Sequence, residues 1–381
     1  MKKVSYPAIF VCFALIMFIS WGLVYDVYTN TKKDNDKKSE KDKSEKEVFL
    51  KEAMFYEKLD DKKVKCGLCP RGCILSDGAV GFCRVRQNIG GVLYTLNYGK
   101  VVAANVDPIE KKPFFHFLPG TKSFSIACAG CNMRCRYCQN WEISQRGVEE
   151  SDEYIEPSKI VELALKTGSR SIAYTYSEPF VFYEYMIDIA KIAKERGIKN
   201  IVVTGGFINK KPLEELLRYI DAVKVDLKGF NEEFYRKYTS GDLKAILETI
   251  KVIKKSGRHL EIVNLVIPGV NDSDDDIKRL SLWIKENLGA DVPLHFTRFY
   301  PNYKMMDTPP TPKETLVKAR KIAMDIGLRY VYTGNIYNPD GENTYCPDGS
   351  IAIERRGFFV IKNNLKDGRC PDGTYLPGVW K

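Results

Sequence analysis

The sequence predicts a mixed α/β fold with a partial β/α barrel at its centre. From about residue 120 onward, short apolar runs of strand length alternate with longer amphipathic patterns of helix length. Two of the helical patterns end at Gly197 and Gly257. The alternation predicts a parallel sheet with right-handed crossovers, and about six or seven units fit a partial barrel better than a closed eightfold one. In such barrels the active site lies on the loops that follow the strands.

The predicted strands and helices alternate from the start of this region to its end. The first strand is SFSIA, the next helix is IVELALKTG, and the strand SIAYT follows it. The same pattern then repeats, with each amphipathic helix returning the chain to the start of the next strand. The predicted strands are 123–127, 171–175, 200–206, 222–229, 260–269, 293–300 and 330–334. The predicted helices are 160–168, 180–197, 212–220, 243–257, 274–289 and 313–327.

The N-terminus predicts a membrane anchor and a spacer. Residues 7–25 are apolar and uncharged, and a helix of this length just spans a bilayer. No clear cleavage site for a signal peptide follows them, so an uncleaved anchor is favoured. Residues 32–47 are nearly all Lys, Asp or Glu, which predicts a disordered linker. More positive residues follow the span than precede it, so we expect a cytoplasmic catalytic domain.

Composition argues against a nucleic-acid partner and indicates what the many cysteines do. The chain has 381 residues, a net charge of +10 and 11 cysteines. The positive charge forms no block outside the linker, so nucleic acid is not expected as a partner. Most of the cysteines stand in tight clusters within a long chain, which indicates metal or iron–sulfur ligands rather than a disulfide framework. Such thiols survive only in a reducing compartment, which also favours the cytoplasm.

One cysteine cluster follows the first predicted strand directly. Cys131, Cys135 and Cys138 form the spacing C-x-x-x-C-x-x-C. Three thiolates on one short loop can hold three irons of a [4Fe–4S] cluster and leave the fourth iron open for a substrate. A structural zinc site is the alternative, with Cys128 as its fourth ligand. Cys128 can equally be a small buried residue at the strand end.

A second cluster lies nearer the N-terminus. It predicts a closed metal site, because four thiols leave no open coordination position. The spacing alone does not separate structural zinc from a second iron–sulfur cluster that transfers electrons. Its members are Cys66, Cys69, Cys73 and Cys83.

These motifs resemble those of the radical SAM superfamily, on the branch of pyruvate formate-lyase activating enzymes. More closely, the chain is similar to the radical SAM enzyme of the AmmeMemoRadiSam system. The resemblance covers roughly residues 50–381 and rests on CGLCPRGC (66–73), CNMRCRYCQNWEISQ (131–145), YTYSEP (174–179), VDLKGF (225–230), LVIPGVNDS (265–273) and HFTRFYP (295–301). It implies a partial (β/α)6-type radical SAM barrel. The implied domains are an anchor at 1–30, a linker at 31–50, a Cys-rich segment at 51–118, the barrel at 119–335 and a degenerate zinc-ribbon-like tail at 336–381.

The resemblance also implies roles for residues on the barrel loops. Tyr137 matches an aromatic residue near the adenine of S-adenosylmethionine (SAM). Ser177 and Glu178 stand where relatives carry a Gly-Gly-Glu-Pro type loop, so we expect Glu178 to bind the amino group of SAM. Gly205 and Gly206 end the third strand, where bare backbone can approach the cofactor. Glu178 can alternatively be an acid favoured at a helix N-terminus.

Four further residues are predicted by the same resemblance. Asp226 and Lys228 match an Asp-Leu-Lys stretch and are expected to meet the ribose or carboxylate of SAM. Asn264 is assigned to cofactor binding on the next strand. His295 falls where activating enzymes carry a histidine, and it is predicted with Lys228 as catalytic. The alternatives are a surface ion pair at the Asp-Leu-Lys stretch and a satisfied structural role for the histidine.

The tail departs from the family pattern. Relatives carry two Cys-Pro-x-Cys pairs there, whereas this chain has only Cys346 and Cys370. Two thiolates cannot complete a tetrahedral zinc site. Asp348 and Asp372 can substitute for the missing thiols, or the two cysteines can form a disulfide, which would argue for an oxidising location.

The resemblance predicts a radical SAM oxidoreductase. The cluster would cleave SAM reductively to a 5′-deoxyadenosyl radical, which abstracts hydrogen from a substrate that the sequence does not identify. Glycyl-radical-enzyme activation is one alternative, and a membrane-tethered iron–sulfur electron carrier is another. Expected partners are a reductant such as flavodoxin or ferredoxin, the other AmmeMemoRadiSam proteins and the membrane. Expected cofactors are the cluster, SAM, and zinc or a second cluster at the N-terminal thiols.

Overall fold

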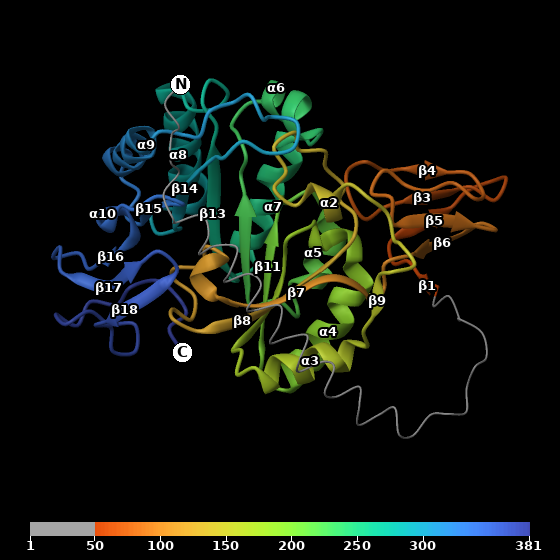
Figure 1. Cartoon of the computed structure of the whole chain (residues 1–381), viewed down its shortest axis with the longest axis horizontal. Helices are drawn as coiled ribbons and strands as arrows, with labels where there is room; N and C mark the ends of the chain where they lie inside the picture. The colour runs from red at the N-terminus through yellow and green to blue at the C-terminus, as the bar shows by residue number, and fades with distance from the viewer. Residues whose placement is uncertain (1–49) are drawn as a thin grey trace, which may run out of the picture.

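A computed structural model describes residues 50–381, and a nine-stranded sheet lies at its centre (Figure 1). Its strands are β7 (Lys100–Pro108), β8 (Lys122–Cys128), β9 (Glu153–Tyr154), β10 (Ser171–Tyr174), β11 (Lys199–Thr204), β12 (Ala222–Asp226), β13 (His259–Val266), β14 (Leu294–Arg298) and β15 (Val331–Gly334). They are ordered β15-β14-β13-β12-β11-β10-β8-β7-β9. Every pair from β15 to β8 is parallel, and β7 and β9 extend the sheet antiparallel. The sheet stays open between β15 and β9, which confirms the predicted partial barrel.

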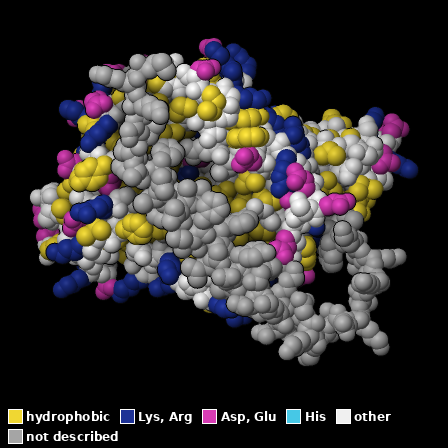
Figure 2. All heavy atoms as spheres, viewed as in Figure 1, with side chains coloured by type: hydrophobic (Ala, Val, Ile, Leu, Met, Phe, Trp, Pro, Cys, Tyr) yellow, Lys and Arg dark blue, Asp and Glu magenta, His cyan; other side chains and the backbone are white. Residues whose placement is uncertain are grey.

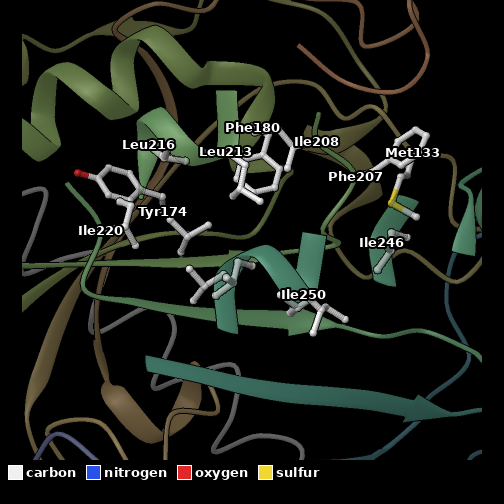
Figure 3. Close-up of a cluster of buried hydrophobic side chains, with 14 of the residues drawn as sticks. Met133, Tyr174, Phe180, Phe207, Ile208, Leu213, Leu216, Ile220, Ile246 and Ile250 are labelled. Atoms are coloured by element: carbon white, nitrogen blue, oxygen red, sulfur yellow. The ribbon is translucent and has the colours of Figure 1, made fainter. Parts of the chain in front are cut away.

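Helices cover one face of this sheet, as the alternating pattern predicts. They are α3 (Pro157–Lys166), α4 (Tyr183–Glu195), α5 (Lys210–Leu216), α7 (Leu243–Lys255), α8 (Asp274–Leu288) and α9 (Lys313–Ile326). Their apolar faces pack on every second residue of the strands. Figure 3 shows part of this core, in which Tyr174 of β10 lies near Leu216 of α5 and Ile220, and Leu213 lies near Phe180. The burial of these large apolar side chains is the main term that holds the layers together.

Local sequence signals set the ends of the helices. The side chain of Ser273 accepts a hydrogen bond from the backbone nitrogen of Asp276 and caps the start of α8. Three aspartates stand in the first turn of that helix and Lys285 in the last, in agreement with the helix dipole. Gly289 then ends the helix with φ of 92°. Asp242 caps α7 in the same way as Ser273 caps α8.

A loop closes the amino-terminal ends of the strands. After the 3-10 helix η2 (Ile109–Lys111), Phe114 and Phe117 are buried against Ala173, Ile201 and Ala222. These three strand residues are register partners on the sheet face opposite the helices. We call residues 109–118 the floor loop. Because it fills the barrel at this end, the opposite end is the one left for a site.

The Cys-rich segment forms two small antiparallel sheets beside the barrel (Figure 1). A buried ion pair attaches it, because Arg86 donates to both carboxylate oxygens of Glu184 on α4, at 2.6 and 2.8 Å. The backbone nitrogen of Met54 donates to the same carboxylate at 2.7 Å. The segment is therefore fixed to the barrel at a buried point. Its strands are β1 (Lys51–Glu52), β2 (Tyr56–Lys58), β3 (Val64–Cys66), β4 (Ile74–Leu75), β5 (Arg86–Ile89) and β6 (Val92–Thr95).

The tail packs beneath the floor loop and is held by a disulfide. Cys346 and Cys370 are bonded to each other, so these two thiols are not zinc ligands. Asp348 and Asp372 accept hydrogen bonds from nearby turn residues instead of facing a metal site. Of the predicted alternatives for the tail, the structure contains the disulfide. The tail consists of α10 (Pro339–Glu342), β16 (Thr344–Tyr345), β17 (Ile351–Arg356), β18 (Phe359–Asn363) and an irregular C-terminal stretch.

The predicted anchor at 1–30 and nearly all of the linker at 31–50 lie outside the described residues. Across residues 50–381, no helix is both long and apolar enough to cross a membrane. The face of the molecule in Figure 2 mixes basic and acidic side chains, without a broad patch of one sign among its coloured atoms.

Candidate active site at the carboxyl ends of the strands

The cysteine loop starts with a sharp turn directly after β8. Gly130 has φ of +100°, and a side chain there would lie 2.8 Å from the carbonyl oxygen of Cys83. The position therefore requires glycine. The backbone nitrogen of Met133 donates to the sulfur of Cys131 at 3.3 Å. These constraints place the three predicted thiols on one loop at the carboxyl end of the first barrel strand.

The three thiols fit a positively charged metal group. Burial raises the pKa of Cys131 well above its ordinary value, and it raises the pKa of Cys135 to about 12. Thiolates in such surroundings need a cation to offset their charge. Over the described range 50–381, no three or more His, Cys, Asp or Glu side chains stand close enough to hold a single metal ion.

Glu178 lies opposite the cysteine loop and is held by three donors. The hydroxyl of Thr204 donates to one carboxylate oxygen at 2.6 Å, as does the backbone nitrogen of Phe180 at 3.3 Å. The backbone nitrogen of Gly205 donates to the other oxygen at 2.9 Å. Burial raises the pKa of Glu178, whereas these hydrogen bonds lower it. The carboxylate is fixed in place, and it faces the thiols closely enough to raise the pKa of Cys131 further.

Gly205 marks the point where the elements of the site meet. A side chain there would lie 2.9 Å from the sulfur of Met133, 3.3 Å from a carboxylate oxygen of Glu178 and 3.6 Å from Cε of Lys228. Loops after β8, β10, β11 and β12 therefore approach one another at this glycine. Figure 3 shows Met133 beside Phe207, so the cysteine loop is also anchored in the apolar core. Gly206 differs, because a side chain there would meet Val225 at 3.0 Å, away from the site.

A lysine pair surrounds Asp226 at the end of β12. Lys224 contacts one carboxylate oxygen of Asp226, and Nζ of Lys228 lies 3.2 Å from the other. Burial alone would raise the pKa of Asp226, but the two ammonium groups lower it to about 2. The carboxylate is therefore ionised at neutral pH. Sequence reasoning missed Lys224, although its spacing of two residues from Asp226 puts both on one face of the strand.

Buried polar atoms without partners also lie on these loops. The hydroxyl of Tyr137 and the side-chain oxygens of Asn132 and Asn264 have no hydrogen-bond partner. Such atoms are costly to bury, and a bound ligand with polar groups would satisfy them. The amide nitrogen of Asn264 donates to the carbonyl of Leu227 at 2.7 Å, which fixes this side chain beside the Asp226 loop. Ser177 is already paired, because its hydroxyl donates to the carbonyl of Cys128 at 2.6 Å.

His295 belongs to a different buried network. Its Nε2 lies 2.7 Å from a carboxylate oxygen of Glu261, and its ring stacks on Tyr332 with centroids 5.0 Å apart. Glu261 also accepts hydrogen bonds from the backbone nitrogens of Phe115 and His116 in the floor loop. Burial lowers the pKa of His295, and its link toward the cysteine side is electrostatic, through Lys224. This placement favours the structural alternative for His295.

The four thiols of the predicted N-terminal site line one shared cavity. Cys66, Cys69, Cys73 and Cys83 line one cavity of about 20 Å³, although they come from two different turns. Arg71, Arg86 and Asn132 line the same cavity, and sequence reasoning missed all three. The only sequence signal for Arg71 is its position between two of the cysteines.

Comparisons with known proteins identify relatives of the chain. The sequence profile described as "Radical SAM superfamily" matches residues 125–280. An uncharacterized protein of Methanocaldococcus jannaschii is 48% identical over 322 residues, which span 84% of this chain and 96% of that protein. The pyruvate formate-lyase-activating enzyme of Clostridium pasteurianum is 23% identical over 221 residues, which span 55% of this chain and 92% of that enzyme.

A solved structure also aligns with part of the chain. It is a domain of pyruvate-formate lyase-activating enzyme from Bacteroides vulgatus, with 20% sequence identity and a TM-score of 0.38. The alignment covers 43% of this chain and 99% of that domain.

Proposed function

The chain belongs to the radical SAM superfamily and is related to pyruvate formate-lyase activating enzymes, and we propose that Cys131, Cys135 and Cys138 hold its [4Fe–4S] cluster. When bound, the cluster supplies the electron that cleaves SAM to methionine and a 5′-deoxyadenosyl radical. One observation carries the residue assignment: the cysteine loop, Glu178 and Lys228 all meet at Gly205. In the proposed reaction, this radical then abstracts a hydrogen atom from the substrate.

The residues around Gly205 have distinct proposed tasks. Glu178 binds the amino group of SAM in a charge-assisted contact, and Thr204 with Gly205 keeps its carboxylate in the required orientation. Asp226 stays ionised between its two lysines and accepts hydrogen bonds from the ribose hydroxyls. The unpaired hydroxyl of Tyr137 is available to the nucleoside. Together these groups orient the cofactor before any electron moves.

The floor loop supports radical chemistry by keeping water out of the barrel. Phe114 and Phe117 are both at most 1% exposed, and they fill the amino-terminal end of the sheet. A reactive carbon radical formed at the other end is then shielded from quenching from below. Access for a substrate is left to the side where the strands end.

Anaerobic turnover tests the proposal. Reconstituted protein is incubated with dithionite and SAM, and 5′-deoxyadenosine is measured by chromatography. We expect the wild type to form it and Cys135→Ala to lose it, because that variant removes one of the three ligands. Cys128→Ala is the matched control, since Cys128 lies in β8 and its electrostatic partners include none of the three thiols. No 5′-deoxyadenosine from wild-type protein at full cluster occupancy would favour an electron carrier over an enzyme.

Two substrate classes are candidates, one suggested by the relatives and one by the sequence resemblance. The pyruvate formate-lyase activating enzymes support a protein substrate that receives a glycyl radical. The resemblance to the AmmeMemoRadiSam enzyme supports a small molecule handled with the other proteins of that system. Deuterated candidates separate the two classes, because hydrogen abstraction transfers the label into 5′-deoxyadenosine. Electron spin resonance of a protein partner after turnover would reveal a glycyl radical.

We also propose that the apolar segment at 7–25 anchors the enzyme to the membrane, with the catalytic domain on the cytoplasmic side. The eight free thiols of the described residues support this side, whereas the Cys346–Cys370 disulfide argues for an oxidising compartment. A flavodoxin or ferredoxin then delivers electrons from the cytoplasm. Fractionation of cells that express the full chain tests this assignment against a variant lacking residues 1–30. Recovery of the full chain in the soluble fraction would refute the anchor and leave the catalytic proposal intact.

A further inference from the structure

The four thiols of the Cys-rich segment converge although they come from two separate turns. The first turn follows β3, where the backbone nitrogen of Cys66 donates to the carbonyl of Cys73 at 2.9 Å. Cys69 lies inside this turn, which places three thiols on one bend of the chain. Cys83 comes from a later turn and completes the lining of the shared cavity. Four thiols around one cavity match the ligand number of a cubane iron–sulfur cluster, whereas in the described residues they do not stand close enough together to hold a single metal ion.

This cavity adjoins the cysteine loop of the active site. Asn132, the residue after Cys131, lines the cavity directly. Arg71 donates from Nε to the carbonyl of Asn132 at 2.6 Å. On the other side, the backbone at Cys83 packs so closely on Gly130 that a side chain at Gly130 would clash with it. Arg134 lies between the same segments, because its guanidinium donates to the carbonyls of Cys131 and Phe82. The two thiol sets are therefore separated by little more than one backbone segment and two arginines.

Arg71 shares its positive charge between the two sets. Its side chain lines the cavity of the N-terminal thiols and also donates to the carbonyl of Asn132, the residue after Cys131. The guanidinium group also packs 3.5 Å from the ring centroid of Phe82, which fixes its position. A purely structural zinc site has no need for a cation that it shares with the active-site loop. A cation between two redox centres stabilises the reduced, more negative state of both.

The N-terminal thiols lie near the surface, and their position relative to the active-site loop is fixed. Cys69 and Cys73 are only partly buried, so an electron carrier can approach this side. The buried pair between Arg86 and Glu184 holds the segment rigidly on the barrel. Arg86 also lines the cavity. The spacing between the two thiol sets therefore does not depend on a flexible linker.

We propose that Cys66, Cys69, Cys73 and Cys83 bind a second iron–sulfur cluster that relays electrons to the active-site cluster. This proposal rests on the function proposed above. In each step a reduced ferredoxin or flavodoxin loses one electron, the second cluster gains it, and the active-site cluster then receives it while the second cluster returns to its oxidised state. No bond forms or breaks in the relay. Zinc cannot perform it, because zinc has no accessible redox change.

Metal analysis of the full chain tests the second cluster directly. Protein reconstituted anaerobically with iron and sulfide is assayed for iron, acid-labile sulfide and zinc. We expect about eight irons per wild-type chain and about four in the double variants Cys69→Ser/Cys73→Ser and Cys135→Ala/Cys138→Ala. Cys128→Ala is the matched control and should keep about eight. About four irons in the wild type, or zinc bound at the N-terminal thiols, would overturn the inference.

Electron spin resonance separates this proposal from the active-site assignment. In Cys69→Ser/Cys73→Ser, the remaining reduced cluster should still change its spectrum when SAM is added. In Cys135→Ala/Cys138→Ala, the remaining cluster should not respond to SAM. A wild type with two clusters and no response to SAM would refute the active-site proposal alone. A wild type with one SAM-responsive cluster would refute the second cluster alone.

The shared arginine gives a test that needs no cysteine substitution. Arg71→Gln removes the positive charge, so both clusters should become harder to reduce and both midpoint potentials should shift to more negative values. Arg84→Gln is the matched control, because Arg84 is an exposed neighbour in the same segment. A redox titration followed by absorbance and spin resonance measures both centres. A shift confined to one centre, or equal shifts in the control, would contradict the relay.

Discussion

Replacing Glu178 with glutamine tests the core of the proposed SAM site. Its carboxylate accepts from Thr204, Gly205 and Phe180, so every neighbour that holds it is a donor. A glutamine amide turns a donor toward at least one of these donors, and a buried unsatisfied donor costs ~1–3 kcal/mol. Loss of the charge-assisted contact to the SAM amino group costs ~1.5–3 kcal/mol more in binding. We therefore expect a lower melting temperature and roughly 10- to 150-fold weaker SAM binding.

Thr204→Val separates these two effects. It removes one of the donors to Glu178 but keeps the negative charge, so we expect reduced stability with SAM affinity much closer to the wild type. Anaerobic calorimetric titration of SAM into reconstituted protein measures affinity, with iron content determined on the same sample. Scanning calorimetry measures stability. Wild-type SAM affinity in Glu178→Gln at full cluster occupancy would refute the role given to this carboxylate.

Three further outcomes follow from buried contacts. Arg86→Met leaves Glu184 buried without its partner, so we expect a loss of ~3–5 kcal/mol in urea unfolding and faster proteolysis of the Cys-rich segment; equal cleavage rates would contradict this attachment. Reduction of the Cys346–Cys370 disulfide, or its replacement by serines, should cost ~3 kcal/mol in thermal unfolding and leave iron content unchanged; no change in melting temperature would count against it. The pKa of Asp226 is held at about 2, below its ordinary 3.8, so the stability it contributes is present above pH 3.8 and is lost as the pH falls toward 2. A variant in which its two lysines are replaced by methionine should lose stability at neutral pH and show a smaller decline over this range, and an unchanged profile would be the contrary result.

The barrel could be predicted because its signals are local. The predicted strand at 123–127 lies within β8, and the predicted helix at 274–289 matches α8 except for its final glycine. The helices carry their own apolar period, and α7 and α8 also carry a side-chain cap, so no distant residue is needed to recognise them. Glu178 and Gly205 were predicted from the family resemblance, and their contact lies at the edge of the sheet where loops after parallel strands meet.

Contacts between distant segments could not be predicted in this way. Glu261 binds His295 and the floor loop at once, yet nothing in its own strand distinguishes it from a surface acid. The family resemblance predicted a catalytic role for His295, and its buried partner Glu261 was not visible in the sequence. Arg71 likewise reads as a turn residue until the fold brings it against Asn132. Long-range polar pairs carry no periodic signal, which is why Glu261 and Arg71 were missed.

The floor of the barrel has a consequence for how the protein is made. The floor loop is joined to the last residues of the chain, since the backbone nitrogen of Leu118 donates to the carbonyl of Val379 at 2.7 Å and Val379 donates back to His116 at 2.8 Å. The floor loop and the cysteine loop are therefore synthesised well before the segment around Val379 that pairs with the floor loop. Until that segment emerges, the floor loop lacks these two backbone hydrogen bonds. The metal centres are best protected if they are loaded after the segment has docked.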